Sequence, residues 1–438
     1  MALQDHNIEK SDDTEASVGS NRHASEPITP IIPPEGGLTG WLCVIGCSMC
    51  MFSTFGFLNA IGVFQTYYQL HELSQYTPSI ISWIFALQLC LMWLPAPLFG
   101  RLLDTYGPTP VLIPCSVLCV FSLCMTSLCH KYYQIILAQG IGFGFGACGI
   151  FVSAFVCAGQ WFEKRRGLAL GIVTAGSSLG GVIFPIFVNK LIGQVGFYGT
   201  VRYVALLIGI LQVFACFLVK ARMPRKKWNK ETKWVDFTLF KDPTFALYTA
   251  GTFLVMWGLW APFDYLSSMA LNHGFSNSLS IYLISMINAG SIPGRILPGH
   301  LADTIGYFNT MTIVCILTGL SIITLWIPFT YHSSHVGLIF FAIVYGFLSG
   351  AFISLMMPCC AKSGTLQTLG QRFGTFQSII AISCLTGLPI SGAILNRGGS
   401  RDGYLGLQIF SAVAMVGGGV VIGIARMGMA GWKLKKRV

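Results

Sequence analysis

The stretch from Trp161 to Gly181 reads WFEKRRGLALGIVTAGSSLGG, and it decides the fold class of this chain. It opens with a charged cluster that contains Lys164, Arg165 and Arg166, and an apolar run with five glycines follows. Charged side chains are costly to place in hydrocarbon, so the cluster is expected at a membrane surface. Regularly spaced glycines let membrane helices pack closely. The stretch therefore predicts a membrane helix, its boundary and its packing face.

The composition of the whole chain agrees with a membrane location. Of the 438 residues, 54% are hydrophobic and 10% are charged, and the mean hydropathy is +0.67. Soluble domains carry about 25% charged residues. The fifteen cysteines lie almost entirely in apolar runs, where a thiol behaves as a small apolar residue. We therefore expect a protein that crosses the bilayer several times.

Apolar runs of about 20 residues, which is the length that spans a bilayer, recur along the chain. The predicted membrane helices cover residues 41–66, 79–100, 109–129, 133–158, 167–192, 200–220, 244–268, 279–301, 308–329, 336–358, 373–395 and 404–427. Twelve spans place both termini on the same side. The predicted fold class is an all-α membrane protein with twelve transmembrane helices in two pseudo-symmetric six-helix bundles.

Lysine and arginine set the expected orientation, because positive charge accumulates on the cytosolic side. With both termini in the cytosol, the inner connections carry most of the basic residues, and this placement accounts for the net charge of +11 without nucleic acid as a partner. The expected parts are a disordered cytosolic tail (1–40), a first bundle (41–220), a basic cytosolic linker (221–243), a second bundle (244–428) and a basic cytosolic tail (429–438). We expect the plasma membrane, with the vacuolar membrane as the alternative.

The two halves carry a repeated motif. The segment from Gly100 to Gly107 reads GRLLDTYG, and the segment from Gly299 to Gly306 reads GHLADTIG. Each copy follows a proline-interrupted apolar run at the second span of its half. Transporters are often built from such internal repeats. The repeat therefore favours a transporter made of two related halves.

The chain resembles the monocarboxylate porter family of the major facilitator superfamily, and its fungal members most closely. The resemblance covers roughly residues 33–428 and implies transport by alternating access. It lies in two motifs, one at the first span and one at the fifth. The matching residues are Pro34, Glu35, Gly36, Gly37 and Trp41 in the first, and Phe162, Lys164, Arg165, Arg166, Leu168, Ala169, Gly171, Ala175, Gly176 and Gly180 in the second.

Two ionisable residues at membrane depth are candidates for substrate binding or proton coupling, since such residues are costly there and often functional. Asp264 follows Pro262 and either faces a cavity or lies near the outer headgroups. Arg295 follows Pro293 and Gly294 and either binds a carboxylate through its two parallel N–H groups or extends to the inner surface. A function in transport is favoured for Arg295, and the headgroup location for Asp264.

The resemblance adds further candidates for the substrate site. In the proton-linked members of the family, an aspartate lies four residues before this arginine and a lysine lies late in the first helix. The corresponding residues here are Ser291 and Asn59, which argues against proton–lactate symport and leaves Asp264 as a candidate proton site. Several polar residues either line a cavity or make interhelical hydrogen bonds, and for each one taken singly the second interpretation is favoured. They are Asn59, Gln65, Gln88, Gln139, Asn288 and Gln377.

Asp104 and Asp303 are candidates for gating at the cytosolic face. In the resembled fold, acids of this loop and nearby arginines hold the two halves together on the inner side. The candidate partners are Arg101, Arg165, Arg166 and Arg372.

The predicted function is secondary transport of a small organic solute, most plausibly the export of an amphipathic secondary metabolite. Proton-coupled uptake of a monocarboxylate or vitamin-like anion is the alternative, and a transporter-like nutrient sensor is a minor one. The glycines 144, 146 and 149 match a nucleotide-binding pattern but lie in an apolar span, so helix packing is expected instead. No metal, cofactor, obligate protein partner or enzymatic activity is expected; the partners are the substrate and the lipid bilayer.

Overall fold

The computed structural model describes residues 35–225, 227, 234–332, 334–364, 369–397 and 399–431, all within one compact unit. In these ranges every regular element is a helix. Helices satisfy their own backbone hydrogen bonds, which a membrane interior requires. Most of the predicted N-terminal tail, and parts of the linker and of the C-terminal tail, lie outside the described residues.

Helices α1 to α8 form the first half of the chain, and π-helical turns interrupt two of its spans. The elements are α1 (Gly37–Met51), η1 (Phe52–Gly56), α2 (Ile61–Leu70), α3 (Pro78–Trp93), α4 (Ala96–Tyr106), α5 (Thr109–Thr126), α6 (Tyr132–Ile135), η2 (Ile136–Phe143), α7 (Gly144–Trp161) and α8 (Arg166–Leu218).

Helices α9 to α16 form the second half, preceded by the short 3-10 helix η3. The elements are η3 (Phe237–Lys241), α9 (Pro243–Leu259), α10 (Ala261–Asn272), α11 (Asn277–Ile305), α12 (Tyr307–Ser321), η4 (Ile322–Trp326), α13 (Ile327–Phe329), α14 (His335–Lys362), α15 (Leu369–Arg397) and α16 (Gly399–Ala430).

Local sequence explains several helix boundaries. Asp242 and Ser276 accept hydrogen bonds from the first turns of α9 and α11, as N-cap side chains do. Helix α8 runs for 53 residues but contains Gly196 at φ 72° and ψ 174°, a backbone conformation that suits glycine and ends one helix before the next begins. Helix α8 therefore corresponds to two predicted spans, 167–192 and 200–220.

Ten helical stretches in the described residues are long and apolar enough to cross a membrane, and they cover eleven of the twelve predicted spans. The twelfth, 279–301, is α11. This helix is long enough at 29 residues but is not among the ten stretches. Its polar residues, which include Asn288 and Arg295, lower its hydropathy. The most polar of the predicted spans is therefore the one that carries the candidate arginine.

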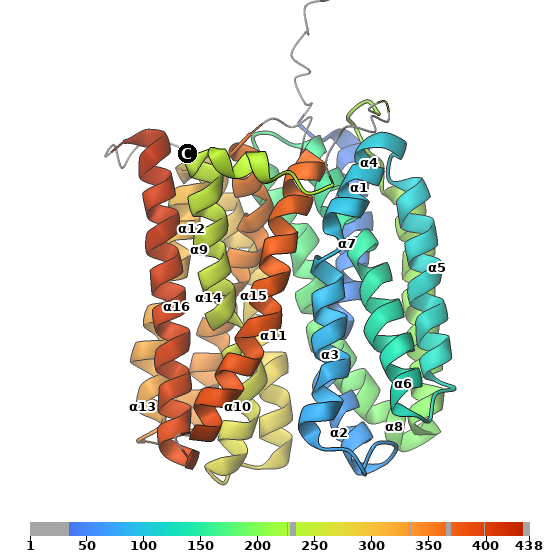
Figure 1. The fold of residues 1–438 in the computed structure, drawn as a ribbon, viewed down its shortest axis with the longest axis vertical. Coiled ribbons are helices and arrows are strands. Elements are labelled where there is room, and N and C mark those ends of the chain that lie inside the picture. The colour runs from blue at the N-terminus through green and yellow to red at the C-terminus, as the bar shows by residue number, and fades with distance from the viewer. Residues whose placement is uncertain are drawn as a thin grey trace, which may run out of the picture. The chain divides into compact units, whose positions relative to one another are not determined.

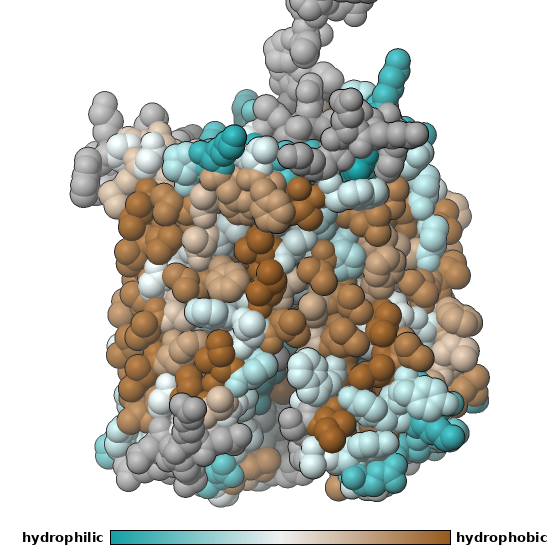
Figure 2. Space-filling model, in the orientation of Figure 1, coloured by the Kyte–Doolittle hydropathy of each residue, from teal (hydrophilic) through white to brown (hydrophobic). Residues whose placement is uncertain are grey.

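The two halves of the chain stand beside each other in Figure 1, with α1–α8 in blue to green and α9–α16 in yellow-green to red. We call the end of the helices that carries Trp161, Leu218 and Pro243 the linker end. Figure 2 shows apolar residues over the middle of this face and polar residues near its two ends. A membrane-spanning unit has this distribution.

Helices α8 and α11 make the largest contact between the halves, and α4 and α15 make the second. Both contacts reach the linker end. A Cβ on Gly299 of α11 would lie 2.5 Å from the carbonyl oxygen of Gly167 on α8, and Gly100 of α4 packs on Gly370 of α15 just as tightly. The glycines of the predicted repeat thus lie at equivalent places between the halves.

The glycines 144, 146 and 149 serve helix packing, as expected. A Cβ at Gly144 would lie 2.8 Å from the carbonyl oxygen of Gln88, and one at Gly146 would lie 2.8 Å from the sulfur of Cys119. Helix α7 therefore approaches α3 and α5 closely through these positions.

Candidate functional site

Arg295 lies buried in the contact between the two halves, with 8% of its surface exposed. Its Nε donates to the hydroxyl of Ser291 on its own helix at 3.0 Å. Its Nη1 donates to the backbone carbonyl of Thr174 and to the hydroxyl of Ser177, both on α8 of the other half. All these acceptors are neutral, so in the described part of the chain no carboxylate pairs with the buried guanidinium.

Ser291 extends this contact from α11 to α8. Its hydroxyl accepts a hydrogen bond from Ser178 at 3.1 Å, and both side chains are buried. The Ser291 hydroxyl also accepts from Arg295, so it holds the arginine without supplying a charge. Ser291 therefore orients the Arg295 guanidinium without neutralising its charge.

Asn59 and Asn288 form a second link between the halves, farther from the linker end. The Nδ2 of Asn288 donates to the Oδ1 of Asn59 at 3.0 Å and to the carbonyl of Ile284. Gly181 of α8 makes room for this pair, because a Cβ there would collide with the Asn288 side chain. The structure thus brings Asn59, Asn288, Ser291 and Arg295 into one polar strip along α11.

The α8 side of this strip was not predicted from the sequence. The sequence pattern places Thr174, Ser177 and Ser178 only within a glycine-rich run that packs against other helices. A signal was present, because residues 167, 171, 174, 178 and 181 recur at helical spacing and therefore share one face. The face that the glycines open for close approach is the same face that carries the hydroxyl groups.

Asp264 lies apart from this strip, in the first turn of α10 just after the helix break at Trp260. Its side chain is exposed to solvent although protein atoms surround it closely. Asp264 therefore has the access to water that a proton site needs, but it does not contact Arg295.

At the linker end, Asp303 holds the first turn of α8. Its carboxylate accepts hydrogen bonds from the backbone N–H groups of Gly167 at 2.7 Å and Leu168 at 2.9 Å, and from the hydroxyl of Tyr307 at 2.9 Å. Burial raises the pKa of Asp303 above its ordinary value, although these hydrogen bonds act to lower it. The acid of one half thus caps a helix of the other half.

Asp104 occupies the equivalent place in the first repeat. A Cβ on Gly370, in the first turn of α15, would lie 2.5 Å from the Oδ1 of Asp104. Gly370 and Gly167 each lie one residue inside their helices. The two acids of the repeat therefore lie over the starts of α15 and α8 in the same manner.

The four candidate arginines of the gate have separate environments. Arg101 is buried, and its guanidinium lies 4.3 Å from the ring centre of Trp234 in the linker. Arg166 is buried and donates to the carbonyls of Gly159 and Phe162. The remaining two are less enclosed: Arg165 is exposed, and Arg372 is half-buried and donates to the carbonyl of Ser363. Backbone amides and Tyr307, rather than an arginine, are the hydrogen-bond partners of Asp303.

The two motifs that carry the family resemblance meet at the linker end, although they are far apart in the sequence. Glu35 accepts a hydrogen bond from the backbone N–H of Lys164 at 2.9 Å. The ring of Trp41 lies 4.9 Å from that of Phe162. Gly36, at φ 83°, lies so close to Phe162 that a Cβ would come within 2.5 Å of the ring. The first motif therefore forms the surface on which the second motif packs.

At the end of the helices opposite the linker end, three residues link three connections of the first half. This triad was not predicted from the sequence. The hydroxyl of Tyr198 donates to the Glu72 carboxylate and lies 2.8 Å from Nδ1 of His130. His130 and Glu72 are 3.5 Å apart. The three residues come from different connections, and no spacing in the sequence links them.

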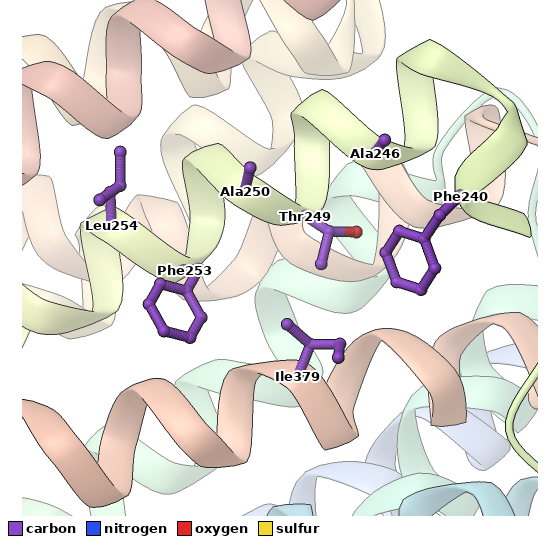
Figure 3. Close-up of a pocket in the computed structure, with 7 residues that line it drawn as sticks. All are labelled: Phe240, Ala246, Thr249, Ala250, Phe253, Leu254 and Ile379. Atoms are coloured by element: carbon purple, nitrogen blue, oxygen red, sulfur yellow. The ribbon is translucent and has the colours of Figure 1, made fainter. Parts of the chain in front are cut away.

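An apolar groove of about 410 Å³ runs between α9 and α15. Figure 3 shows the residues that line it: Phe240, Ala246, Thr249, Ala250, Phe253, Leu254 and Ile379. Its one polar side chain, Thr249, donates its hydroxyl to the carbonyl of Phe245. The groove contains none of the predicted site residues and no charge, so its chemistry suits a lipid chain rather than an anionic substrate.

Comparisons with known proteins agree with this architecture. Residues 41–388 match the family model described as Major Facilitator Superfamily. The chain is 42% identical to the MFS-type transporter hasB of Aspergillus fumigatus over 93% of each protein. It is 38% identical to a fujikurins efflux protein of Gibberella fujikuroi, with 96% of this chain and 88% of that protein covered.

A third relative and one solved structure complete the comparison. The chain is 38% identical to the aspyridones efflux protein apdF of Emericella nidulans, with 90% of this chain and 79% of that protein covered. The human organic anion transporter MFSD10 has the same fold, with a TM-score of 0.68 at 13% identity over 88% of this chain and 98% of that one. The family model covers most of the chain, and the match covers 79–93% of the length of these three relatives. The chain belongs to the Major Facilitator Superfamily, a family of multi-pass membrane transporters.

Proposed function

We propose that this protein exports an amphipathic organic anion, a secondary metabolite, and that Arg295 binds its acidic group. Three fungal relatives are named as efflux proteins, for fujikurins, aspyridones and agnestins. These relatives align with 90% or more of this chain at 38% identity. The similarity supports the direction of transport and the class of substrate.

The observation that carries the proposal is the uncompensated charge of Arg295. An ionised group buried without a partner of opposite charge is costly, and a guanidinium binds a carboxylate through two parallel hydrogen bonds. In the described residues the hydrogen-bond acceptors of Arg295 are neutral oxygens. An incoming anion would therefore bind the guanidinium more strongly than these acceptors do. Binding would replace the hydrogen bonds of Arg295 to α8 and so loosen the contact between the halves.

When an anion replaces the hydrogen bonds between Arg295 and α8, the two halves can move apart. Such a movement is a step of alternating access, in which the two halves rock about a central site. We assign the substrate site to Asn59, Asn288, Ser291 and Arg295, with Asp264 as the coupling group that exchanges protons with water. The assignment of the chain to the monocarboxylate porter family rests on the Trp161–Gly181 motif and on the first-span motif that packs against it. Ser291 and Asn59 replace the charged residues of the proton-linked members, which favours export over proton-linked uptake.

We assign the gate to Asp104 and Asp303 with Arg101, Arg165, Arg166 and Arg372, and we place the linker end in the cytosol. The halves would then comprise residues 41–220 and 244–428, joined by the basic linker 221–243. The basic residues at this end support a cytosolic location for both termini. The plasma membrane is the proposed location, since an exporter acts there directly.

Comparative metabolite profiling tests the proposal. Cells with and without the gene are compared, with medium and cell pellet measured separately at two external pH values. Export predicts that one amphipathic acid accumulates inside the deletant and is depleted outside. Failure of the deletant to draw a carboxylate or vitamin from the medium would establish uptake instead, and unchanged metabolites with altered gene expression would indicate a sensor.

The role of Arg295 is tested in the complemented deletant. Arg295→Ala should lower the export rate about 10- to 100-fold, the equivalent of losing a charge-assisted hydrogen-bonded pair. Arg295→Lys keeps the charge without the fork geometry and should lie between Arg295→Ala and wild type. Arg202→Ala, which removes an exposed arginine from α8, is the matched control and should export normally. Normal export by Arg295→Ala at wild-type abundance would refute the assignment.

A further inference from the structure

Gln377 of α15 is fully buried, and neither its side-chain oxygen nor its side-chain nitrogen has a hydrogen-bond partner in the structure. It lies one turn after Phe373 and so on the same helix face. The next residue, Ser378, donates to the carbonyl of Leu94 where α3 meets α4. Gln377 therefore lies where α15 of the second half meets the first half.

One turn before Gln377, the Phe373 ring packs on aromatic rings of the first half. The ring centre of Phe373 lies 6.1 Å from Phe151 and 5.6 Å from Phe155, both on α7. Phe151 in turn lies 5.0 Å from Trp93 and 5.3 Å from Phe55. We call these five buried rings the aromatic plug: Phe55, Trp93, Phe151, Phe155 and Phe373. The indole nitrogen of Trp93 is a second buried donor without a partner.

An amide in these surroundings is unfavourable for the closed arrangement. Gln offers two donors and an oxygen acceptor, and a buried polar group without partners is destabilising. A leucine would fill the same volume without that cost. When the halves part at the linker end, α15 leaves α7, and the amide and the ring faces become accessible together. The position suits a group whose partner arrives only in the open state.

We propose that Gln377 and the aromatic plug form a ring-binding subsite, which takes a planar conjugated group that carries a carbonyl or hydroxyl. The ring stacks on Phe373 and Phe151, and its polar group pairs with the Gln377 amide. The subsite rests on the proposed function, because the acid of the same molecule binds Arg295. The substrate class is thereby narrowed to conjugated, oxygen-bearing organic acids.

The depths of the two anchors agree with one shared substrate. Arg295 lies ten residues before the end of α11 at Ile305, and Gln377 lies eight residues after the start of α15 at Leu369. At about 1.5 Å per residue, the two side chains lie roughly 15 Å and 12 Å from the linker ends of their helices. Both also lie on helix faces that contact the first half.

Binding of three small acids to the purified full-length protein tests the subsite. The probes are 6-hydroxy-2-naphthoate, 2-naphthoate and cyclohexanecarboxylate, and dissociation constants are measured by equilibrium dialysis. Wild type should bind the hydroxylated naphthoate most tightly and cyclohexanecarboxylate most weakly. Gln377→Leu should bring the two naphthoates to within about twofold of each other, and Phe373→Leu should bring 2-naphthoate close to cyclohexanecarboxylate.

The controls separate this proposal from the proposed function. Arg295→Ala should weaken all three acids by the same factor, and if it changes none of them the anion site itself is refuted. Gln88→Leu is the matched control, since Gln88 is also buried without partners but lies on α3, with its backbone against Gly144. It should keep the wild-type order.

A second variant tests the subsite if Gln377→Leu folds poorly. Gln377→Met preserves the volume better than Leu and should show the same loss of discrimination. Melting temperatures of both variants at or above that of wild type would show that the amide is not needed for folding. An unchanged preference for the hydroxylated probe in folded Gln377→Leu and Gln377→Met would overturn the subsite.

Discussion

Asp303 caps the first turn of α8 through the backbone N–H of Gly167, at a hydrogen-bond distance of 2.7 Å. The carboxylate belongs to the second half of the chain and the amide to the first. A negative side chain at a helix N-terminus is favourable because unpaired N–H groups and the positive end of the helix dipole meet there. One residue therefore joins the halves at the linker end without any arginine.

Replacing Asp303 by Ala should open the linker end more often. The change leaves the N–H groups of Gly167 and Leu168 without their acceptor, which costs about 1–3 kcal/mol. Peptide-resolved alkylation of Cys157, which is buried on α7, should become about 5- to 100-fold faster. Asp303→Asn keeps an acceptor and avoids the buried charge, so its alkylation rate should stay closer to wild type. Equal rates in all three proteins would contradict the capping role.

Gly299→Ala should separate α8 from α11, and Gly100→Ala should separate α4 from α15. In the first case the new methyl group would lie 2.5 Å from the carbonyl oxygen of Gly167, too close for the present packing. Both variants should lower the transport rate and the melting temperature. Gly193→Ala is the control, because no atom lies within 4 Å of its Cβ position. A wild-type melting temperature in both variants would show that the close contacts are dispensable.

Ser291→Asp should inhibit transport more than Ser291→Ala. Ser291 Oγ already accepts a hydrogen bond from Arg295 at 3.0 Å, so a carboxylate there would pair with the guanidinium and compete with the substrate anion. We expect at least a tenfold rise in the dissociation constant for 2-naphthoate in Ser291→Asp and a change below threefold in Ser291→Ala. The reverse order would exclude Arg295 as the anion anchor.

Trp234→Ala should loosen the linker. The Arg101 guanidinium lies 4.3 Å from the indole, a contact worth about 0.5–1 kcal/mol when partly exposed. Limited trypsin digestion should cleave after Arg225 a few-fold faster in this variant. Phe237→Ala, at a linker ring that is 67% exposed, should digest at the wild-type rate. Identical digestion of the two variants would show that Trp234 does not hold the linker.

The sequence predicted the helical class, twelve helical spans and the repeat around Asp104 and Asp303, because these follow from local composition and spacing. Eleven of the twelve spans lie in stretches apolar enough to cross a membrane, and the twelfth is helix α11. It also located Arg295, Ser291, Asn288 and Asn59 individually. Their assembly into one strip was not predictable, since the hydrogen bonds of Arg295 to Thr174 and Ser177 depend on how α8 and α11 dock. The same limit applies to Tyr198, Glu72 and His130, whose contacts exist only after three connections fold together.

Glu35 and Lys164 are 129 residues apart in the chain, yet the side chain of one binds the backbone of the other. A ribosome that adds 5–20 residues per second needs roughly 6–26 seconds to make the intervening segment. During that time the first helix is in the membrane without Phe162 packed against it. Assembly of the first half is therefore completed only after the fifth span has been synthesised, and damage to residues 35–41 should reduce the yield of protein during biogenesis rather than the activity of molecules already assembled.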